Sequence, residues 1–379
     1  MTNFKIARWD ATGFAAQIRG VLSISLLVVG SGFSRAADSE SWDMLTQFGS
    51  DLYPSVIVST STFHTDPEDD DPTVLGDQMG QIGAIVEAPE DDARVKVEVS
   101  SQKLISPSVF EGRLPKGGEI YSIFPFLSYD YDSLLKVRQP FPENVTVRVT
   151  IDGERLGQKQ KRMLARSVND CPFGVADEDG QYTSLDILFA AYVNENHPFV
   201  DEILGEALNS GDTKSFAGYQ GNHDDVLREL EAIWNAFKER GFAYSSITRP
   251  SVNRDKVYTQ HVRLIGDSIK TAQANCVDGS VLFASVFRKL GLDPFLISIP
   301  GHMFLGVYLD SDHSDFACIE TTMLSTSTFA EAVEAGNEQF KKHHDELTAE
   351  ASNDPNYALI DIDAARKMGI LPLREPSAE

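Results

Sequence analysis

Several features are scarce in this chain, and each scarcity excludes a class of protein. Only three residues are cysteine, too few for a small domain held together by disulfide bonds. Lysine and arginine number 33 against 57 aspartates and glutamates, a formal net charge of −24. Because nucleic-acid-binding proteins carry a basic surface that releases counterions, this deficit argues against a nucleic-acid partner. Beyond residue 40 no apolar run approaches the roughly 18 residues of a membrane-spanning helix, so we expect no integral membrane body.

The chain does contain enough apolar material for two packed cores. It has 379 residues, of which 42% are hydrophobic. Single hydrophobic cores stop growing at roughly 250–300 residues, so a chain of this length divides more readily than it enlarges one core. We therefore expect an acidic globular protein of two domains.

The first 36 residues have the pattern of a signal peptide. Lys5, Arg8 and Arg19 precede an apolar stretch at 21–33, which is too short for a membrane span. Ser34 and Ala36 supply small residues at the two positions that a signal peptidase reads, which predicts cleavage after Ala36. The alternatives are an uncleaved anchor or an incidental apolar start. We expect export, to a periplasm or out of the cell.

Residues 37–165 have the pattern of a β-sandwich. The segments 93–100 and 144–151 alternate valine with polar residues, the period of a half-buried strand. The second ends at Asp152 and Gly153, a hairpin turn signal. The segment 55–63 also reads as a strand, and no long helical period appears. An immunoglobulin-like β-sandwich is the interpretation of this first domain.

Residues 166–379 have a mixed pattern that predicts an α+β domain. One expected helix, at 198–208, is capped by Asn196, and another, at 277–290, is apolar almost all round and therefore buried. Other helices are expected at 184–193, 224–240 and 328–347, and strands at 294–299, 303–309, 315–322 and 357–362.

Three residues of this second domain form a candidate catalytic group. Cys276 stands at the start of the buried helix, where free N–H groups and the helix dipole favour a thiolate. His302 opens the second strand after that helix, and Glu320 lies on the next strand. In a hairpin around 310–312, positions 302 and 320 would share a face and lie opposite each other, close enough for a carboxylate to bond an imidazole. Together they predict a nucleophile, a base and an orienting acid.

Each of these residues taken alone has a plainer interpretation. A single cysteine at a helix start is more often a small buried apolar residue, and a single histidine on a strand is usually structural. The three in this order favour chemistry over packing. Cys171 and Cys318 could pair as a disulfide, which would account for the odd cysteine count and leave Cys276 free.

The segments around these residues resemble the bacterial transglutaminase-like proteins of the papain-like cysteine superfamily. The matching segments are NCVDGSVLFAS at 275–285, PGHMFLGVY at 300–308 and IETT at 319–322, with weaker likeness in QHVR at 260–263, YVNENHP at 192–198 and DIDAAR at 361–366. The resemblance covers about 190 to 370 and leaves out the sandwich. Two residues depart from the family pattern. Glu320 replaces the usual aspartate, and Met303 replaces the aromatic residue that often follows the histidine.

The resemblance implies a papain/transglutaminase-like core and acyl transfer on an amide. Cys276 would attack the carbonyl of a protein or peptide, and His302 would protonate the departing amine. Water or an amine would then resolve the thioester. Gln260 is implied as an oxyanion donor, with an ordinary exposed glutamine as the alternative. No metal or organic cofactor is required, and His223 is not interpreted as a ligand. The competing hypothesis is a non-catalytic binding module that retains this fold.

Overall fold

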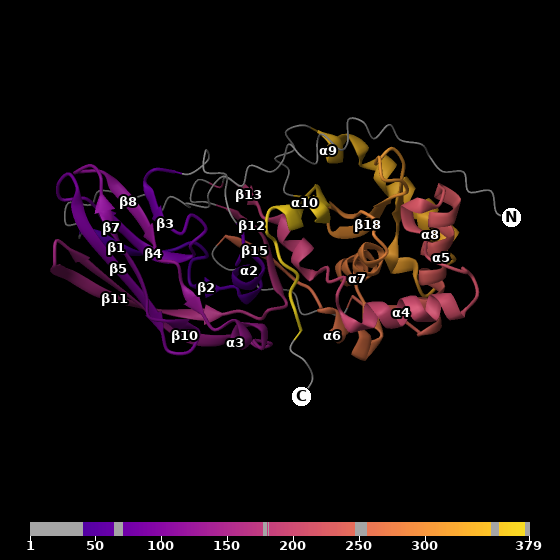
Figure 1. The fold of residues 1–379 in the computed structure, drawn as a ribbon, viewed down its shortest axis with the longest axis horizontal. Helices are drawn as coiled ribbons and strands as arrows, with labels where there is room; N and C mark the ends of the chain where they lie inside the picture. The colour runs from indigo at the N-terminus through magenta and orange to yellow at the C-terminus, as the bar shows by residue number, and fades with distance from the viewer. Residues whose placement is uncertain are drawn as a thin grey trace.

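The computed structural model describes residues 41–63, 71–176, 180, 182–246, 256–349 and 356–375. It is a mixed α+β protein. Strands of the first 165 residues gather at one end, and the later helices and a further sheet form the other (Figure 1). The signal peptide expected at 1–36 lies outside the described residues. In the described part of the chain, no helix is both long and apolar enough to cross a membrane.

The strand-rich end consists of two principal sheets that enclose one cluster of buried side chains. The four-stranded sheet has the order β1-β4-β8-β3, with bounds Trp42–Thr46, Ile82–Glu87, Ile120–Phe124 and Val74–Gly76. The five-stranded sheet has the order β2-β11-β10-β5-β7, with bounds Asp51–Leu52, Glu154–Ala165, Phe141–Ile151, Ala93–Ser101 and Ser108–Leu114. A small pair joins β6 (Ile105–Ser106) to β9 (Ser128–Tyr129).

The alternating segments form strands as expected. In β5 the side chains of Val95, Val97 and Val99 are at most 2% exposed, because the two-residue period turns all three into the space between the sheets. Asp152 and Gly153 turn β10 into β11 with φ of 49° and 85°. Those positive values explain why an Asp-Gly pair stands there.

The segment 55–63 is not a strand, contrary to the sequence prediction. It contains the helix α2 (Pro54–Ser59), which begins with the proline that a first helical turn tolerates. Val56, Ile57 and Ser59 are all buried, so the helix shows no polar face. A short run that is buried all round has the same sequence pattern as a buried strand, and the tertiary surroundings decide between the two. A second short helix, α3, spans Tyr131–Leu135.

The other end packs helices against a four-stranded sheet of order β19-β18-β17-β20. Its strands span Phe316–Ile319, His302–Tyr308, Pro294–Ile299 and Ala358–Asp361. The helices are α4 (Pro198–Asn209), α5 (His223–Glu239), α6 (Ile265–Thr271), α7 (Cys276–Lys289), α8 (Phe329–Lys342), α9 (His344–Thr348) and α10 (Ile362–Lys367). Helix α7 packs on β17 and β18, and α8 packs on β19. The centre of this body is aromatic, with Phe237 and Phe283 rings 4.5 Å apart.

Three expectations for this body need correction. The helix expected at 184–193 is the 3-10 helix η1 (Asp186–Tyr192). Helix α4 is capped by His197, whose Nδ1 accepts the amide of Phe199, because Asn196 is held in the preceding turn by Asn194. The long helix expected at 328–347 is two helices, α8 and α9, that meet at His343.

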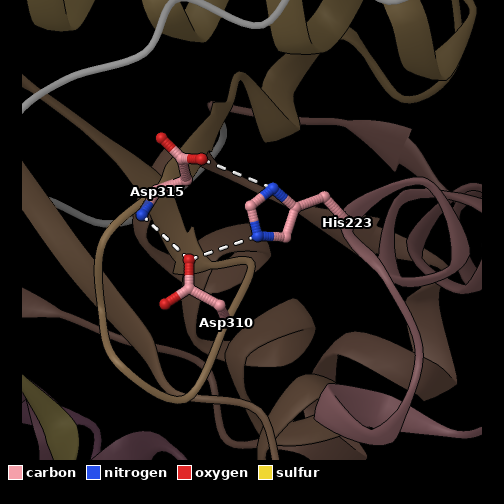
Figure 2. Close-up of side chains that lie close together, drawn as sticks. All are labelled: His223, Asp310 and Asp315. Carbon is pink, nitrogen blue, oxygen red and sulfur yellow. Dashed lines mark hydrogen bonds and ion pairs between the residues drawn. The ribbon is translucent and has the colours of Figure 1, made fainter.

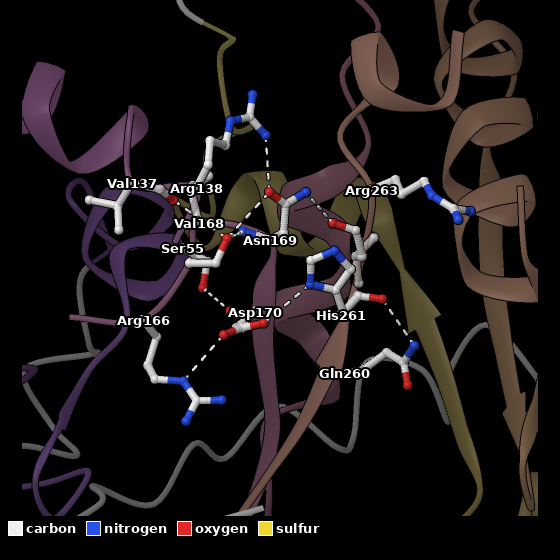
Figure 3. Close-up of polar contacts among 12 residues, drawn as sticks. Ser55, Val137, Arg138, Arg166, Val168, Asn169, Asp170, Gln260, His261 and Arg263 are labelled. Atoms are coloured by element: carbon white, nitrogen blue, oxygen red, sulfur yellow. Dashed lines mark hydrogen bonds and ion pairs between the residues drawn. The ribbon is translucent and has the colours of Figure 1, made fainter. Parts of the chain in front are cut away.

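A buried polar network joins the two ends of the molecule (Figure 3). Asp170 begins β12 (Asp170–Ala176) of a small sheet ordered β13-β12-β15, whose other strands span Tyr182–Ser184 and Val257–His261. Its carboxylate accepts Arg166 Nε at 3.2 Å and faces His261 Nδ1 at 3.3 Å. The same guanidinium lies 3.4 Å from Asp51 at the edge of the five-stranded sheet, and Ser55 of α2 donates to the Asp170 carbonyl.

Candidate active site

The start of α7 places the Cys276 sulfur. Asn275 caps the helix by accepting the amide of Asp278 at 2.8 Å, and the Asp278 carboxylate accepts the Asn275 amide at 3.1 Å. This reciprocal capping box fixes Cys276 as the first helical residue, so its own amide and that of Val277 have no acceptor within the helix. Cys276 is partly exposed, as a reacting thiol must be.

Asp278 also anchors this helix start to the connection between β15 and α6, which carries Arg263. It accepts the Arg263 amide at 2.8 Å and pairs with the Arg263 guanidinium at 2.8 Å. The Asp278 side chain is fully buried, and burial raises its pKa. Two contacts with Arg263 and two within the capping box therefore hold the turn that carries the thiol.

A tight turn places His302 at the first position of β18. Ile299 and His302 are paired across the β17–β18 hairpin, so Pro300 and Gly301 alone form its loop. Gly301 has φ of 73°, which a type II turn requires at its second central position, after a proline. The imidazole therefore stands at the end of the sheet that α7 covers.

Glu320 lies beyond the strand that was expected to carry it, and its register differs from the expected one. β19 ends at Ile319, and Glu320 is the N-cap of the 3-10 helix η3 (Thr321–Met323). Leu305 pairs with Ile319, so continuing the ladder would put residue 322, not Glu320, directly opposite His302. The difference of two residues leaves Glu320 on the same face, diagonal to His302, where a longer carboxylate arm reaches the ring.

The structure brings the thiol, imidazole and carboxylate together. His302 Nε2 lies 2.6 Å from Glu320 Oε2, and Glu320 Oε1 accepts the amide of Thr322 at 3.1 Å and its hydroxyl at 2.5 Å. Burial alone would lower the pKa of His302, but its interactions with Cys276 and Glu320 outweigh burial and raise the pKa to about 10. For Glu320, burial is outweighed by the His302 and Thr322 hydrogen bonds, and the pKa is lowered. The geometry favours a charged imidazolium–carboxylate pair facing the sulfur.

The other two cysteines do not form the suggested disulfide. Cys171 and Cys318 are both free thiols and fully buried. Cys171 belongs to the main core of this end, and Cys318 to a separate apolar cluster of side chains from β17, β18, β19, α8 and α9. Burial raises the pKa of each well above its ordinary value.

A small apolar recess adjoins the group. It is lined by Ala274 and Gly279 on either side of Cys276, by Thr321 next to Glu320, and by Tyr244. Its volume of about 10 Å³ is room for one water molecule. Tyr244 lies on β14 (Ala243–Tyr244), which pairs with β16 (Gln273–Ala274) just before the cysteine. Burial, Cys276 and Glu320 together raise the pKa of the Tyr244 phenol.

Gln260 lies at the edge of the polar network, next to His261 (Figure 3). Its side-chain amide donates to the carbonyl of His261 at 3.0 Å. Gln260 therefore already has an acceptor within its own strand, and its oxyanion role stays a prediction from the family resemblance.

One group of side chains away from the thiol has the composition of a metal site. His223, Asp310 and Asp315 offer ligand atoms within 4.8 Å of one another. Figure 2 shows the ring between the two carboxylates, with Nε2 3.3 Å from Asp310 and Nδ1 3.4 Å from Asp315. Asp310 also accepts the Asp315 amide and the Ser314 hydroxyl. Each ring nitrogen faces a different carboxylate, so the His223 ring bridges Asp310 and Asp315 and ties α5 to the β18–β19 turn.

Several residues of the site have no part in the sequence prediction. Asp278 could have been found, because an asparagine followed three residues later by an acid, before an apolar run, is a capping-box pattern. Arg263, Thr322 and Tyr244 could not, since each reaches the site only through strand pairing or a local turn. Neither a scan against models of known protein families nor a comparison with curated proteins finds a match for this chain.

Proposed function

We propose that this protein is a thiol-dependent acyl transferase or amide hydrolase acting on protein or peptide. The observation that carries the proposal is the position of His302, which bonds Glu320 at 2.6 Å and also interacts with Cys276. A nucleophile, a base and an acid that orients the base are the parts that covalent acyl transfer requires.

Each residue takes one role in the proposed reaction. Glu320 occupies Nε2 of the imidazole, which leaves Nδ1 for the thiol proton. The Cys276 thiolate attacks the amide carbon, and the tetrahedral intermediate collapses as His302 gives its proton to the leaving nitrogen. A thioester and a free amine result. His302 then takes a proton from water or from an acceptor amine, whose attack releases the acid or a new amide and restores the thiol.

Backbone amides stabilise the negative charge on the tetrahedral intermediate by donating hydrogen bonds to it. The capping side chain of Asn275 takes the amide of Asp278, so Cys276 and Val277 carry the free N–H groups nearest the sulfur. Donors fixed in this way need no reorganisation as the oxyanion forms.

The family resemblance supports the same proposal. A Cys, His and acid in this order, at a helix start, a strand start and just after the following strand, are similar to the transglutaminase-like group, and they favour a papain-like core behind an immunoglobulin-like sandwich. The signal peptide expected at 1–36 supports a reaction outside the cytoplasm as part of this proposal. The competing hypothesis, a binding module with this fold, predicts an unactivated thiol.

Alkylation of the intact protein by iodoacetamide separates these two functions. A free thiol loses about tenfold in labelling rate for each pH unit below its pKa, because only the thiolate reacts. If His302 keeps Cys276 ionised, labelling should change less than about threefold between pH 8 and pH 6. Cys171 and Cys318 are buried and serve as internal controls in mass spectrometry of the labelled peptides.

Two variants complete the test. His302→Gln should restore the steep dependence on pH, and Cys276→Ala should abolish rapid labelling. If the labelling rate of the wild type falls tenfold per pH unit, the proposed enzymatic function is contradicted, while the description of the fold is unaffected. With an activated thiol established, new peptide termini would identify hydrolysis and new isopeptide bonds would identify crosslinking in a peptide mixture.

A further inference from the structure

The segment that carries Glu320 is held between two helices. It runs from the end of β19 into η3, and α7 packs against η3 while α8 packs against β19. At each of these contacts the helix presents a glycine, Gly279 on α7 and Gly336 on α8. A glycine inside a helix costs about 1 kcal/mol relative to alanine, so two at such contacts call for a physical reason.

On α7 the reason is the approach of Thr321. Gly279 stands three residues after Cys276, on the same face of the helix. A Cβ on Gly279 would lie 2.9 Å from Thr321 Oγ1 and 3.2 Å from Thr321 Cβ. Thr321 follows Glu320 directly and is 5% exposed. The missing side chain therefore lets the acid-bearing segment rest on the helix one turn from the thiol.

On α8 the contact is with the backbone itself. A Cβ on Gly336 would lie 2.6 Å from the carbonyl carbon and oxygen of Cys318 and 2.7 Å from the amide nitrogen of Ile319. One turn earlier, the carbonyl of Ala332 accepts the Glu320 amide at 3.0 Å. The α8 backbone thus bonds directly to the acid, which requires a helix surface without a side chain at Gly336.

We propose that Gly279 and Gly336 are positioning residues, which let α7 and α8 close on the 318–321 segment and so place the Glu320 carboxylate against His302. The proposal rests on the function proposed above, although the placement itself can be measured without any substrate. Neither glycine needs a left-handed backbone, since both lie within helices, so close approach accounts for both.

The two contacts differ in a way that makes them separable. The Gly279 contact is with a side chain, so truncating Thr321 to alanine removes the 2.9 Å clash and leaves only the 3.2 Å one. The Gly336 contact is with backbone atoms, which no side-chain truncation removes. Thr321→Ala should therefore rescue Gly279→Ala and should not rescue Gly336→Ala.

The readout is the titration of the His302 imidazole, followed by NMR in the full chain and assigned with His302→Gln. In the wild type its midpoint should lie near pH 10. Gly279→Ala should lower the midpoint by about one pH unit or more, because a displaced Glu320 no longer stabilises the charged ring. Gly279→Ala with Thr321→Ala should return it toward the wild-type value. Gly205→Ala is the matched control, a helical glycine whose added Cβ meets nothing within 4 Å.

The outcomes divide clearly. A folded Gly279→Ala variant with the wild-type midpoint overturns the proposal, and so does a double variant that stays shifted. If Gly279→Ala alone does not fold, the proposal still requires the double variant to fold and to titrate like the wild type, and failure there overturns it as well. If wild-type Cys276 labels like a free thiol, the proposed function fails, but the His302 titration still tests the placement of Glu320. The two failures are therefore distinguishable.

Discussion

His302 is the residue on which the charge balance of the site depends. Its side chain is about one quarter exposed and interacts with both Glu320 and Cys276. A raised histidine pKa means that the folded state holds the proton more tightly than the unfolded chain does. The stability this provides is fully present below the ordinary pKa of 6.5 and is lost as pH rises through about 10.

Above pH 7, the free energy of unfolding should therefore depend on pH through His302. Relative to His302→Gln, the wild type should lose stability between pH 7 and pH 10, with a slope of up to about 1.4 kcal/mol per pH unit for one proton. Glu320 has a lowered pKa, so its share is lost at the acid end, as pH falls below 4.5. Urea unfolding from below pH 4.5 up to pH 10 measures both effects. Parallel curves for the two proteins would contradict the assignment.

At the scale of elements, the start of α7 combines a helix cap with a buried ion pair. Asp278 accepts the Asn275 and Arg263 amides and pairs with the Arg263 guanidinium, and its own side chain is fully buried. Removing Asp278 therefore takes away a buried ion pair in addition to the capping bonds.

Asp278→Ala should accordingly lower the free energy of unfolding by about 3–5 kcal/mol. Asn275→Ala, which removes only one capping bond, should lower it by about 0.5–2 kcal/mol. Urea unfolding of both variants tests the ranking. Equal losses would show that the Arg263 pair adds nothing to the cap.

The elements also show what could be predicted from the sequence and what could not. The start of α7 and the turn at Pro300 and Gly301 are local patterns, so Cys276 and His302 could be placed from the sequence alone. The face of Glu320 follows from strand parity, but its register depends on where the β18–β19 turn falls. For helix α2 the sequence predicts a strand, because burial on every side removes the hydrophobic period that distinguishes a helix from a strand. The glycine contacts join segments far apart in the chain and have no local signal.

For the whole molecule, Arg166 is the residue that connects the two ends. Arg166 is 5% exposed, and its guanidinium contacts Asp51 of the five-stranded sheet and Asp170 of β12. Two buried carboxylates on separate bodies thus share one cation. Such a network makes the bodies depend on each other more strongly than apolar contact alone would.

Arg166→Met should therefore do more than lower stability. We expect a loss of about 3–5 kcal/mol, since the substitution takes the same buried cation away from two buried carboxylates. Calorimetry should then resolve two transitions, one for each body, if the wild type unfolds in one. Arg166→Lys, which keeps the charge, is the control. A single unchanged transition in Arg166→Met would show that packing alone couples the ends.

Cys171 and Cys318 are buried free thiols, and this has a consequence for where the chain can fold. Because all three cysteines are free, no covalent crosslink contributes to the native state. A reductant that unfolds many secreted proteins by reducing their disulfide bonds has no such bond to reduce in this protein. The fold is thus indifferent to the redox character of its surroundings, and it can be acquired in a reducing cytosol as readily as beyond the membrane.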